Sequence, residues 1–162
     1  MHCLMSLCPC QSHLRYQDCC QPFHLNTKQP ENAEQLMRSR YSAYTLCNID
    51  YIVQTTLPAQ QPFLDRQAMQ HWARDTDWQG LSIHSYQPHL SKIHSVVAFT
   101  ADFYTPEGMQ HHDECSIFVY TQGRWYFVDP NTPRPTAKQP CLCGSGKKFK
   151  HCCGLQLITY TD

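Results

Sequence analysis

The segment VAFTADFY, residues 97–104, decides the fold class. Its apolar residues at odd-numbered positions alternate with more polar residues at even-numbered ones. A period of two is typical of a β-strand with one face toward a core. The alternation recurs at residues 81–84, 115–119 and 125–127, and turn sequences stand at 106–108 and 122–123. The pattern therefore predicts four successive antiparallel strands.

Two helical segments precede these strands. Residues 33–56 place apolar side chains on one broad face at about 100° per residue, and residues 62–76 repeat them at helical spacing. Pro62 suits the first turn of the second helix. Two helices followed by four strands predict an α+β domain, with helices packed on an antiparallel sheet.

Farther out, cysteines gather at both ends of the chain. The segments CPCQSHLRYQDCC, residues 8–20, and CLCGSGKKFKHCC, residues 141–153, both read Cys-x-Cys, eight residues, Cys-Cys. They hold eight of the eleven cysteines. The N-terminal cluster is Cys8, Cys10, Cys19 and Cys20, and the C-terminal cluster is Cys141, Cys143, Cys152 and Cys153.

Each cluster has the donor set of a structural zinc site. Four thiolates at tetrahedral corners, about 2.3 Å from the metal, bind Zn²⁺. Gly144 and Gly146 permit positive φ angles in the second segment, where the first has Gln11 and His13. An aromatic residue, Tyr16 or Phe149, stands at the same place in each and would cover one side of the metal. We therefore expect two Zn²⁺ sites.

Other cysteine chemistries remain open at this point. The clusters could form disulfides in an oxidising compartment, act as redox dithiols, or ligate iron–sulfur groups. The N-terminus lacks the basic segment and long apolar run of a signal peptide, and no apolar run has the length of a membrane span. We therefore expect a cytoplasmic protein, where clustered thiols favour metal. The expected units are a knuckle at 1–24, an α+β domain at 30–130, a linker at 131–139 and a knuckle at 140–155.

A pocket in the central domain is suggested by Arg40, which falls within the apolar arc of the first helix. A buried guanidinium needs a partner. Arg40, Tyr44 and Trp125 could form an anion-binding pocket, or Arg40 could pair structurally with Asp129 or Asp102. The polar run at 111–114 is expected to be a solvated stretch after a turn, because adjacent strand residues point to opposite faces. No catalytic residue is identified.

Positive charge gathers at the second knuckle. The chain of 162 residues has a formal net charge of zero, so a nucleic-acid role would need a local patch. Lys147, Lys148 and Lys150 lie in a stretch without acidic residues and are candidate partner-binding residues. The alternative is that these lysines only balance the thiolates.

The segment PCLCGSGKKFKHCCG resembles the SEC-C motif, and this resemblance implies that its four cysteines bind zinc. With MRSRYSAY opening the first helix and RWYFVDP closing the last strand, the whole chain resembles the YchJ-like family. The resemblance implies a nuclear transport factor 2-like (cystatin-like) middle domain, a cone with an internal pocket. SEC-C tails of the translocase motor dock onto an acidic chaperone and the ribosome, which implies a protein, ribosomal or nucleic-acid partner here.

The favoured function is that of an uncharacterised zinc-binding interaction module. A small-molecule-binding protein or enzyme that uses the central pocket is the alternative, and a thiol redox sensor is a weaker one. The sequence leaves a homodimer open.

Overall fold

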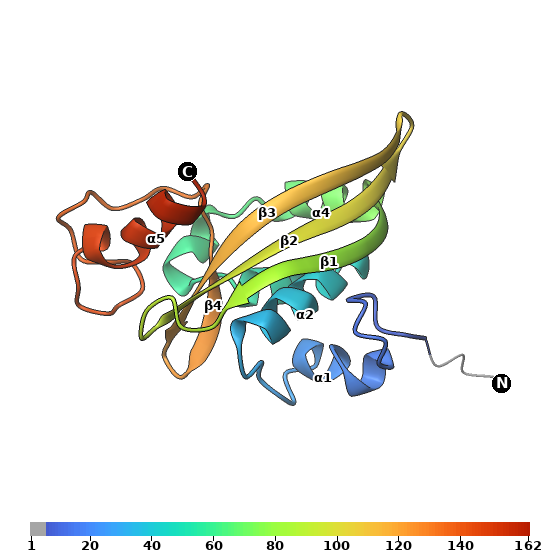
Figure 1. Ribbon diagram of the computed structural model, residues 1–162, viewed down its shortest axis with the longest axis horizontal. Coiled ribbons are helices and arrows are strands. Elements are labelled where there is room, and N and C mark those ends of the chain that lie inside the picture. The colour runs from blue at the N-terminus through green and yellow to red at the C-terminus, as the bar shows by residue number, and fades with distance from the viewer. Residues whose placement is uncertain (1–5) are drawn as a thin grey trace.

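Four antiparallel strands form one sheet, in which the order across the sheet is the order along the chain. The computed structural model describes residues 6–162 and shows the sheet as a strongly twisted ribbon (Figure 1). The strands are β1 (Asp77–Gln87), β2 (His94–Thr105), β3 (Gly108–Thr121) and β4 (Arg124–Val128). Tight turns join β2 to β3 and β3 to β4, as the sequence predicts. The α+β class and the antiparallel sheet are confirmed.

The first predicted helix is broken. It consists of α2 (Ala33–Thr45) and α3 (Ile49–Gln54), so the prediction of one continuous helix over 33–56 is wrong. Cys47 has a φ of 56°, in the left-handed region that ends helices. Asn48 then starts α3, because its side chain accepts a hydrogen bond from the Tyr51 amide at 3.2 Å. The apolar arc spans the break, so periodicity alone does not reveal it.

The second predicted helix starts later than residue 62. Pro62 lies in the 3₁₀ segment η2 (Pro58–Phe63), and α4 runs from Arg66 to Asp75. Asp65 is the N-cap, since its carboxylate accepts a hydrogen bond from the Ala68 amide at 3.0 Å.

Each cysteine cluster is built on a short 3₁₀ turn followed by a helix. The N-terminal segment has η1 (Tyr16–Asp18) and α1 (Gln21–His24), and the C-terminal segment has η3 (Phe149–His151) and α5 (Cys153–Tyr160). The N-terminal segment lies beside α2, whereas α5 lies near the opposite end of the molecule (Figure 1).

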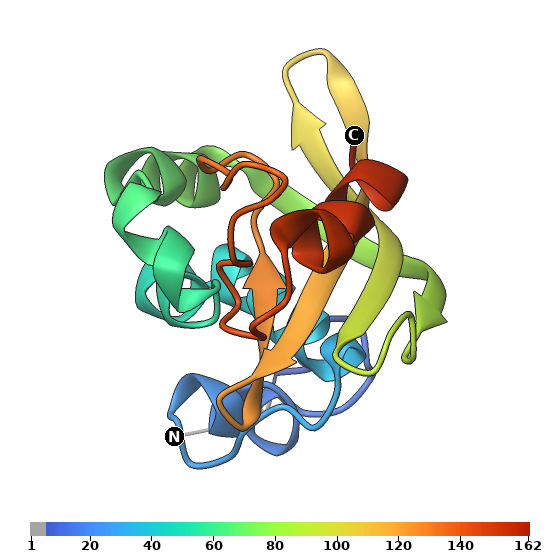
Figure 2. The same cartoon turned by 90° about the vertical axis from the view of Figure 1, so that its left-hand side faces the viewer.

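The two faces of the sheet are covered by different parts of the chain. One face packs Val97, Phe99 and Phe118 against α2. The other face packs Val96, Ile117, Val119 and Val128 into a cluster with the C-terminal cysteines, Phe149 and Leu157. Figure 2 shows α5 lying across β3. The segment over 130–140 lacks helix or strand, but the knuckle that follows it is packed on the sheet and shares a core with it.

Among residues 6–162, no helix combines the length and apolar character that crossing a membrane requires.

Candidate metal centres and internal pocket

Both cysteine clusters bring four sulfur atoms together. Within each cluster all four ligand atoms lie within 4.8 Å of one another. The closest pairs are Cys10–Cys19 at 3.6 Å and Cys143–Cys152 at 3.5 Å. A tetrahedron with metal–sulfur bonds of about 2.3 Å has edges of about 3.8 Å. The spacing fits a four-thiolate metal site and is much longer than a disulfide bond of about 2.05 Å.

The same backbone scaffold carries both clusters. The amide of Cys8 donates to the Leu14 carbonyl at 2.8 Å, and the amide of Cys141 donates to the Lys147 carbonyl at 2.8 Å. Isolated bridges join Leu7 to Arg15 and Pro140 to Lys148. In each segment a serine hydroxyl lies 3.2 Å from the third cysteine sulfur, and these pairs are Ser12–Cys19 and Ser145–Cys152. The sequence repeat is therefore also a structural repeat.

The N-terminal segment reaches this shape without glycine. Gly144 and Gly146 have φ angles of 80° and 83°, as expected. Gln11 and His13 occupy the matching places with φ angles of 65° and 68°. Non-glycine residues at positive φ cost free energy, so the N-terminal segment is the more strained copy.

The central domain contributes a hydrogen-bonding side chain to each cluster. Ser42 on α2 lies with its hydroxyl oxygen 3.4 Å from the sulfur of Cys8 and 3.4 Å from that of Cys20. His94, at the start of β2, lies with Nε2 at 3.3 Å from the sulfur of Cys153. The cluster spacing does not predict either contact, because they join residues 34 and 59 positions apart in the chain.

The tautomer of His94 follows from its other neighbour. The Ser91 hydroxyl oxygen accepts from the amides of Ile93 and His94, both at 3.1 Å, and lies 2.8 Å from Nδ1 of His94. The single proton of the Ser91 hydroxyl is therefore donated to Nδ1 of His94. The proton of the His94 ring is then on Nε2, which faces Cys153. A thiolate that accepts such a hydrogen bond is held in place as a metal ligand.

Hydrogen bonds among the thiols make some of them stronger acids. The bond with Cys141 lowers the pKa of Cys143 to about 6, and bonds from the same cluster lower the pKa of Cys152 strongly. The bond with Cys20 lowers the pKa of Cys10. Metals bind the thiolate, so each cluster holds at least one thiol inclined toward the metal-binding form.

Arg40 is buried without a carboxylate partner. It is 7% exposed, and its Nη1 donates to the Ile52 carbonyl at 2.9 Å and to the hydroxyls of Thr55 at 2.7 Å and Thr56 at 3.3 Å. The guanidinium stacks over the Phe127 ring at 4.3 Å. Within residues 6–162 no ion pair of Arg40 is formed, so the predicted structural pair with Asp129 or Asp102 is absent.

A cavity of about 110 Å³ lies beside Arg40, between α2, α4 and the sheet. Its walls are mostly aromatic and include Tyr44, Trp72 and Trp78. Besides Arg40 and the tyrosines Tyr41 and Tyr44, its polar lining residues are His112, Glu114 and Ser116. Glu114 accepts from the Ser116 hydroxyl at 3.0 Å, and its other oxygen lies 3.1 Å from Nε2 of His112.

Only two of the five predicted pocket residues line this cavity. Arg40 and Tyr44 line the cavity. Asp102 lies on the opposite face, where its carboxylate is 2.6 Å from Nδ1 of His111, and Trp125 stacks edge-on against Tyr120. Asp129 lines a separate, more open depression, which Arg40 and Tyr44 also line. Asp102 and Trp125 are therefore not brought together with Arg40 and Tyr44, whereas Asp129 joins them in that second depression.

Two cavity residues, His112 and Glu114, come from a segment that the sequence does not predict to line a pocket. The polar run over 111–114 is largely solvated, as expected, since His111, His112 and Asp113 are exposed. The run nevertheless lies inside β3 and not in a turn. Because β3 has a period of two, His112 and Glu114 share the face that lines the cavity. Recognising that the strand starts at Gly108 would have placed them there.

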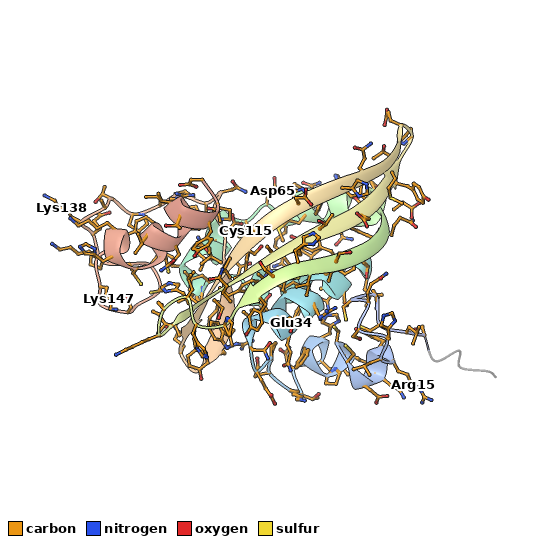
Figure 3. The ribbon with its side chains drawn as sticks, viewed as in Figure 1. Arg15, Glu34, Asp65, Cys115, Lys138 and Lys147 are labelled. Atoms are coloured by element: carbon orange, nitrogen blue, oxygen red, sulfur yellow. The ribbon has the colours of Figure 1, made fainter. Side chains whose placement is uncertain are left out.

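The lysines of the second knuckle are exposed. Lys147, Lys148 and Lys150 are all solvent-accessible, and none forms an ion pair within residues 6–162. Figure 3 shows Lys138 and Lys147 at the outer edge of the molecule, pointing away from the sheet.

Family models match most of this architecture. The model described as "YchJ, middle NTF2-like domain" matches residues 32–130, and the SEC-C motif model matches residues 138–155. This chain belongs to the YchJ-like family. The two models together cover the central sheet domain and the C-terminal cysteine cluster.

Relatives share this combination over nearly their full length. A UPF0225 protein from Actinobacillus succinogenes is 58% identical, over 95% of this chain and all of its own. A UPF0225 protein from Haemophilus influenzae is also 58% identical, over 91% of each chain.

Solved structures of similar proteins agree with the fold. The crystal structure of a SEC-C motif containing protein from Psychrobacter arcticus is 48% identical, with a TM-score of 0.88 over 91% of this chain and 95% of its own. The solution structure of a SEC-C motif containing protein from Rhodopseudomonas palustris is 36% identical, with a TM-score of 0.69 over 75% of this chain and 94% of its own.

Proposed function

We propose that this YchJ-like protein is a cytoplasmic zinc-binding interaction module. Zn²⁺ in both clusters would hold two rigid knuckles on the central domain, and the C-terminal knuckle would contact an acidic protein or nucleic acid. The observation that carries the proposal is the pair of four-sulfur groups on one repeated scaffold, the second surrounded by exposed lysines.

Zinc suits these sites better than other metals. Four thiolates with tetrahedral spacing favour Zn²⁺ or an iron–sulfur group among biological metals. Adjacent cysteines such as Cys19–Cys20 and Cys152–Cys153 are not the usual spacing for iron–sulfur ligation. Each segment is too small to bury a core of its own, so metal binding would supply much of its folding free energy.

The charge of the C-terminal knuckle supports an acidic partner. Four bound thiolates and one Zn²⁺ carry a formal charge of about −2. Lys138, Lys147, Lys148 and Lys150 are all exposed, and residues 138–154 contain no acidic residue. The lysines therefore exceed what the metal site would neutralise, and a positive surface remains for a partner.

Charge reversal tests the partner surface. Lys147→Glu, Lys148→Glu and Lys150→Glu together are expected to reduce retention on immobilised polyglutamate or RNA at least tenfold, since each contact is ionic. The comparison of the two matrices would identify the partner class. The matched control is the triple variant Arg15→Glu, Lys28→Glu and Arg74→Glu, which changes the net charge equally away from this knuckle. Equal loss in both triple variants would contradict a partner site at this knuckle.

The hydrogen bond from His94 gives a second test of the zinc sites. His94→Phe removes the donor beside Cys153 and is expected to weaken Zn²⁺ binding at the C-terminal cluster about 10–100-fold. His94→Gln keeps an N–H group near the position of Nε2 and should retain most of the affinity. Competition with a chromogenic chelator would measure this, and the N-terminal site serves as the internal reference. Equal weakening by both variants would show that His94 acts through packing alone.

The internal cavity supports a second candidate function, small-molecule binding. We place it in the cone that NTF2-like domains form, with Arg40 as its anchor. The observation that favours it is the buried guanidinium that faces a cavity and has no carboxylate partner.

A further inference from the structure

We propose that the cavity beside Arg40 binds a small organic carboxylate with a flat, apolar body. This inference rests on the second candidate function, that the cavity is a ligand site, and it names the class of ligand. The role of the zinc knuckles does not depend on it.

The charge of the ligand follows from Arg40. Its three hydrogen bonds all leave from Nη1 and all go to neutral oxygens. Within residues 6–162 neither Nε nor Nη2 has a hydrogen-bond partner, and neither belongs to the atoms that are both buried and unsatisfied. These two groups are therefore accessible within the hollows that Arg40 lines. We assign them to the cavity, where they form one edge of a guanidinium fork that fits a carboxylate bidentately.

The fixed positive charge of Arg40 supports this choice. Burial lowers the pKa of Arg40, and attraction to Tyr44, Tyr51, Glu114 and Asp129 opposes that shift. Arginine nevertheless stays protonated in proteins. A buried cation without an anion is costly, so a carboxylate that enters the cavity would supply the missing counter-charge.

Glu114 attracts Arg40 at longer range but forms no ion pair with it. Both oxygens of Glu114 are engaged, one by Ser116 and the other by His112. Arg40 is therefore the charged lining group with unused hydrogen-bonding capacity, and a monoanion matches it better than a zwitterion does.

The shape of the ligand follows from the walls. Trp72 and Trp78 meet edge-to-face at 4.9 Å, and Tyr44 packs against Trp72 at 5.5 Å. Such rings favour a flat apolar body. The volume is about 110 Å³, and an apolar cavity of about 150 Å³ holds benzene. The cavity is smaller than that benzene site, so a ligand of one aromatic ring and its carboxylate would extend to the opening, which Trp72 marks with an exposure of 45%.

Benzoate is a suitable probe, with benzamide as its neutral counterpart of the same shape. Titration of the zinc-loaded full chain, followed by tryptophan fluorescence, is expected to show benzoate bound at least tenfold more tightly than benzamide, because a hydrogen bond to a charged group is the stronger one. Trp72 and Trp78 line the site and would report binding. Equal affinity for the two probes, or no binding of benzoate at up to about 20 mM, would overturn the proposal.

Three variants locate the site. Arg40→Gln should abolish the preference for benzoate, but it also removes the bonds that tie α2 to α3. Ala101→Leu leaves Arg40 in place and fills the cavity that Ala101 lines, so it should block both probes. Glu114→Gln removes a negative charge near Arg40 and should tighten benzoate binding several-fold.

The control for Glu114→Gln is Glu107→Gln, an exposed position in the β2–β3 turn that changes the net charge equally. The proposal would be contradicted if Ala101→Leu left the benzoate affinity unchanged and the two glutamine variants changed it equally. Benzoate would then bind elsewhere on the protein. Because the zinc content and the lysine-dependent retention do not involve this cavity, failure here would leave the interaction-module proposal intact.

Discussion

Replacing Cys152 and Cys153 with serine is expected to lower the zinc content from about two ions per chain to about one. Serine oxygen is a poor ligand for Zn²⁺ beside two thiolates, so the C-terminal site should not fill. The measurement is metal content by mass spectrometry on protein purified under reducing conditions. The variant Cys10→Ser, Cys19→Ser should lose the other ion.

The C-terminal double variant is also expected to destabilise the central domain. Cys141, Cys143, Cys152 and Cys153 share one hydrophobic cluster with residues of β2, β3 and β4. Loss of the metal would loosen the cover over that face of the sheet. A loss of about 3 kcal/mol would lower Tm by roughly 6–12 °C in a chain of this size. The N-terminal cluster has a smaller core of its own, so its loss should lower Tm less.

The control for this prediction removes two cysteines outside the clusters. Cys47→Ser, Cys115→Ser takes away the same number of thiols and should retain about two zinc ions. Wild-type protein that holds no zinc and forms disulfides readily would contradict the proposal and favour the thiol redox sensor.

Adding a single methyl group at Gly154 is expected to be nearly as damaging to the C-terminal knuckle. A Cβ atom there would lie 2.6 Å from the Phe149 carbonyl oxygen and 2.8 Å from a ring carbon of Phe149. Gly154 and Phe149 are both buried, and the close oxygen belongs to the backbone, so neither can move aside easily. Gly154→Ala should cost about 2 kcal/mol or more.

The clash also reaches the metal site. Phe149 starts the 3₁₀ turn that leads into Cys152, and its carbonyl accepts from the Cys152 amide at 3.0 Å. Gly154→Ala should therefore weaken zinc binding at the C-terminal cluster while the N-terminal cluster stays filled. Thermal denaturation and chelator competition would measure the two effects.

Leu155→Ala is the matched control for Gly154→Ala. Leu155 is the next residue of α5 and is 48% exposed, so this change should cost under about 0.5 kcal/mol. Gly146 provides a different comparison, because a Cβ there meets nothing within 4 Å and only its φ of 83° resists substitution. Gly146→Ala should thus cost about 1 kcal/mol. A Gly154→Ala variant as stable as Leu155→Ala would show that the backbone relaxes around the methyl group.

Local chemistry explains what could be predicted from the sequence. The four-cysteine spacing lies within 13 residues of chain, so it predicts each group of sulfur atoms directly. In the structure the eight sulfur atoms form two groups of four. The alternation of apolar and polar residues around 97–104 predicts a strand, because successive side chains of a strand point to opposite faces and only one face is buried. The turns at 106–108 and 122–123 then order the strands, since short connections join antiparallel neighbours.

Features that depend on distant contacts could not be predicted in this way. The break at Cys47 interrupts an apolar arc that looks continuous, because α2 and α3 both bury the same kind of side chain. That break lets Arg40 reach the Ile52 carbonyl and the hydroxyls of Thr55 and Thr56, so a carboxylate is not its partner. Periodicity reports burial and says nothing about which group satisfies a buried charge.

The sequence by itself determined that the chain has an α+β domain with a four-cysteine group on either side, because spacing and alternation act over a few residues. Only the tertiary structure decided where those groups dock, with Ser42 beside one and His94 beside the other. It also decided that His112 and Glu114 line the enclosed cavity beside Arg40, that Asp129 lines a more open depression beside the same arginine, and that Asp102 lines neither. These contacts arise from the way one twisted sheet is covered on its two faces, and they join residues too far apart in the chain for any local pattern to report.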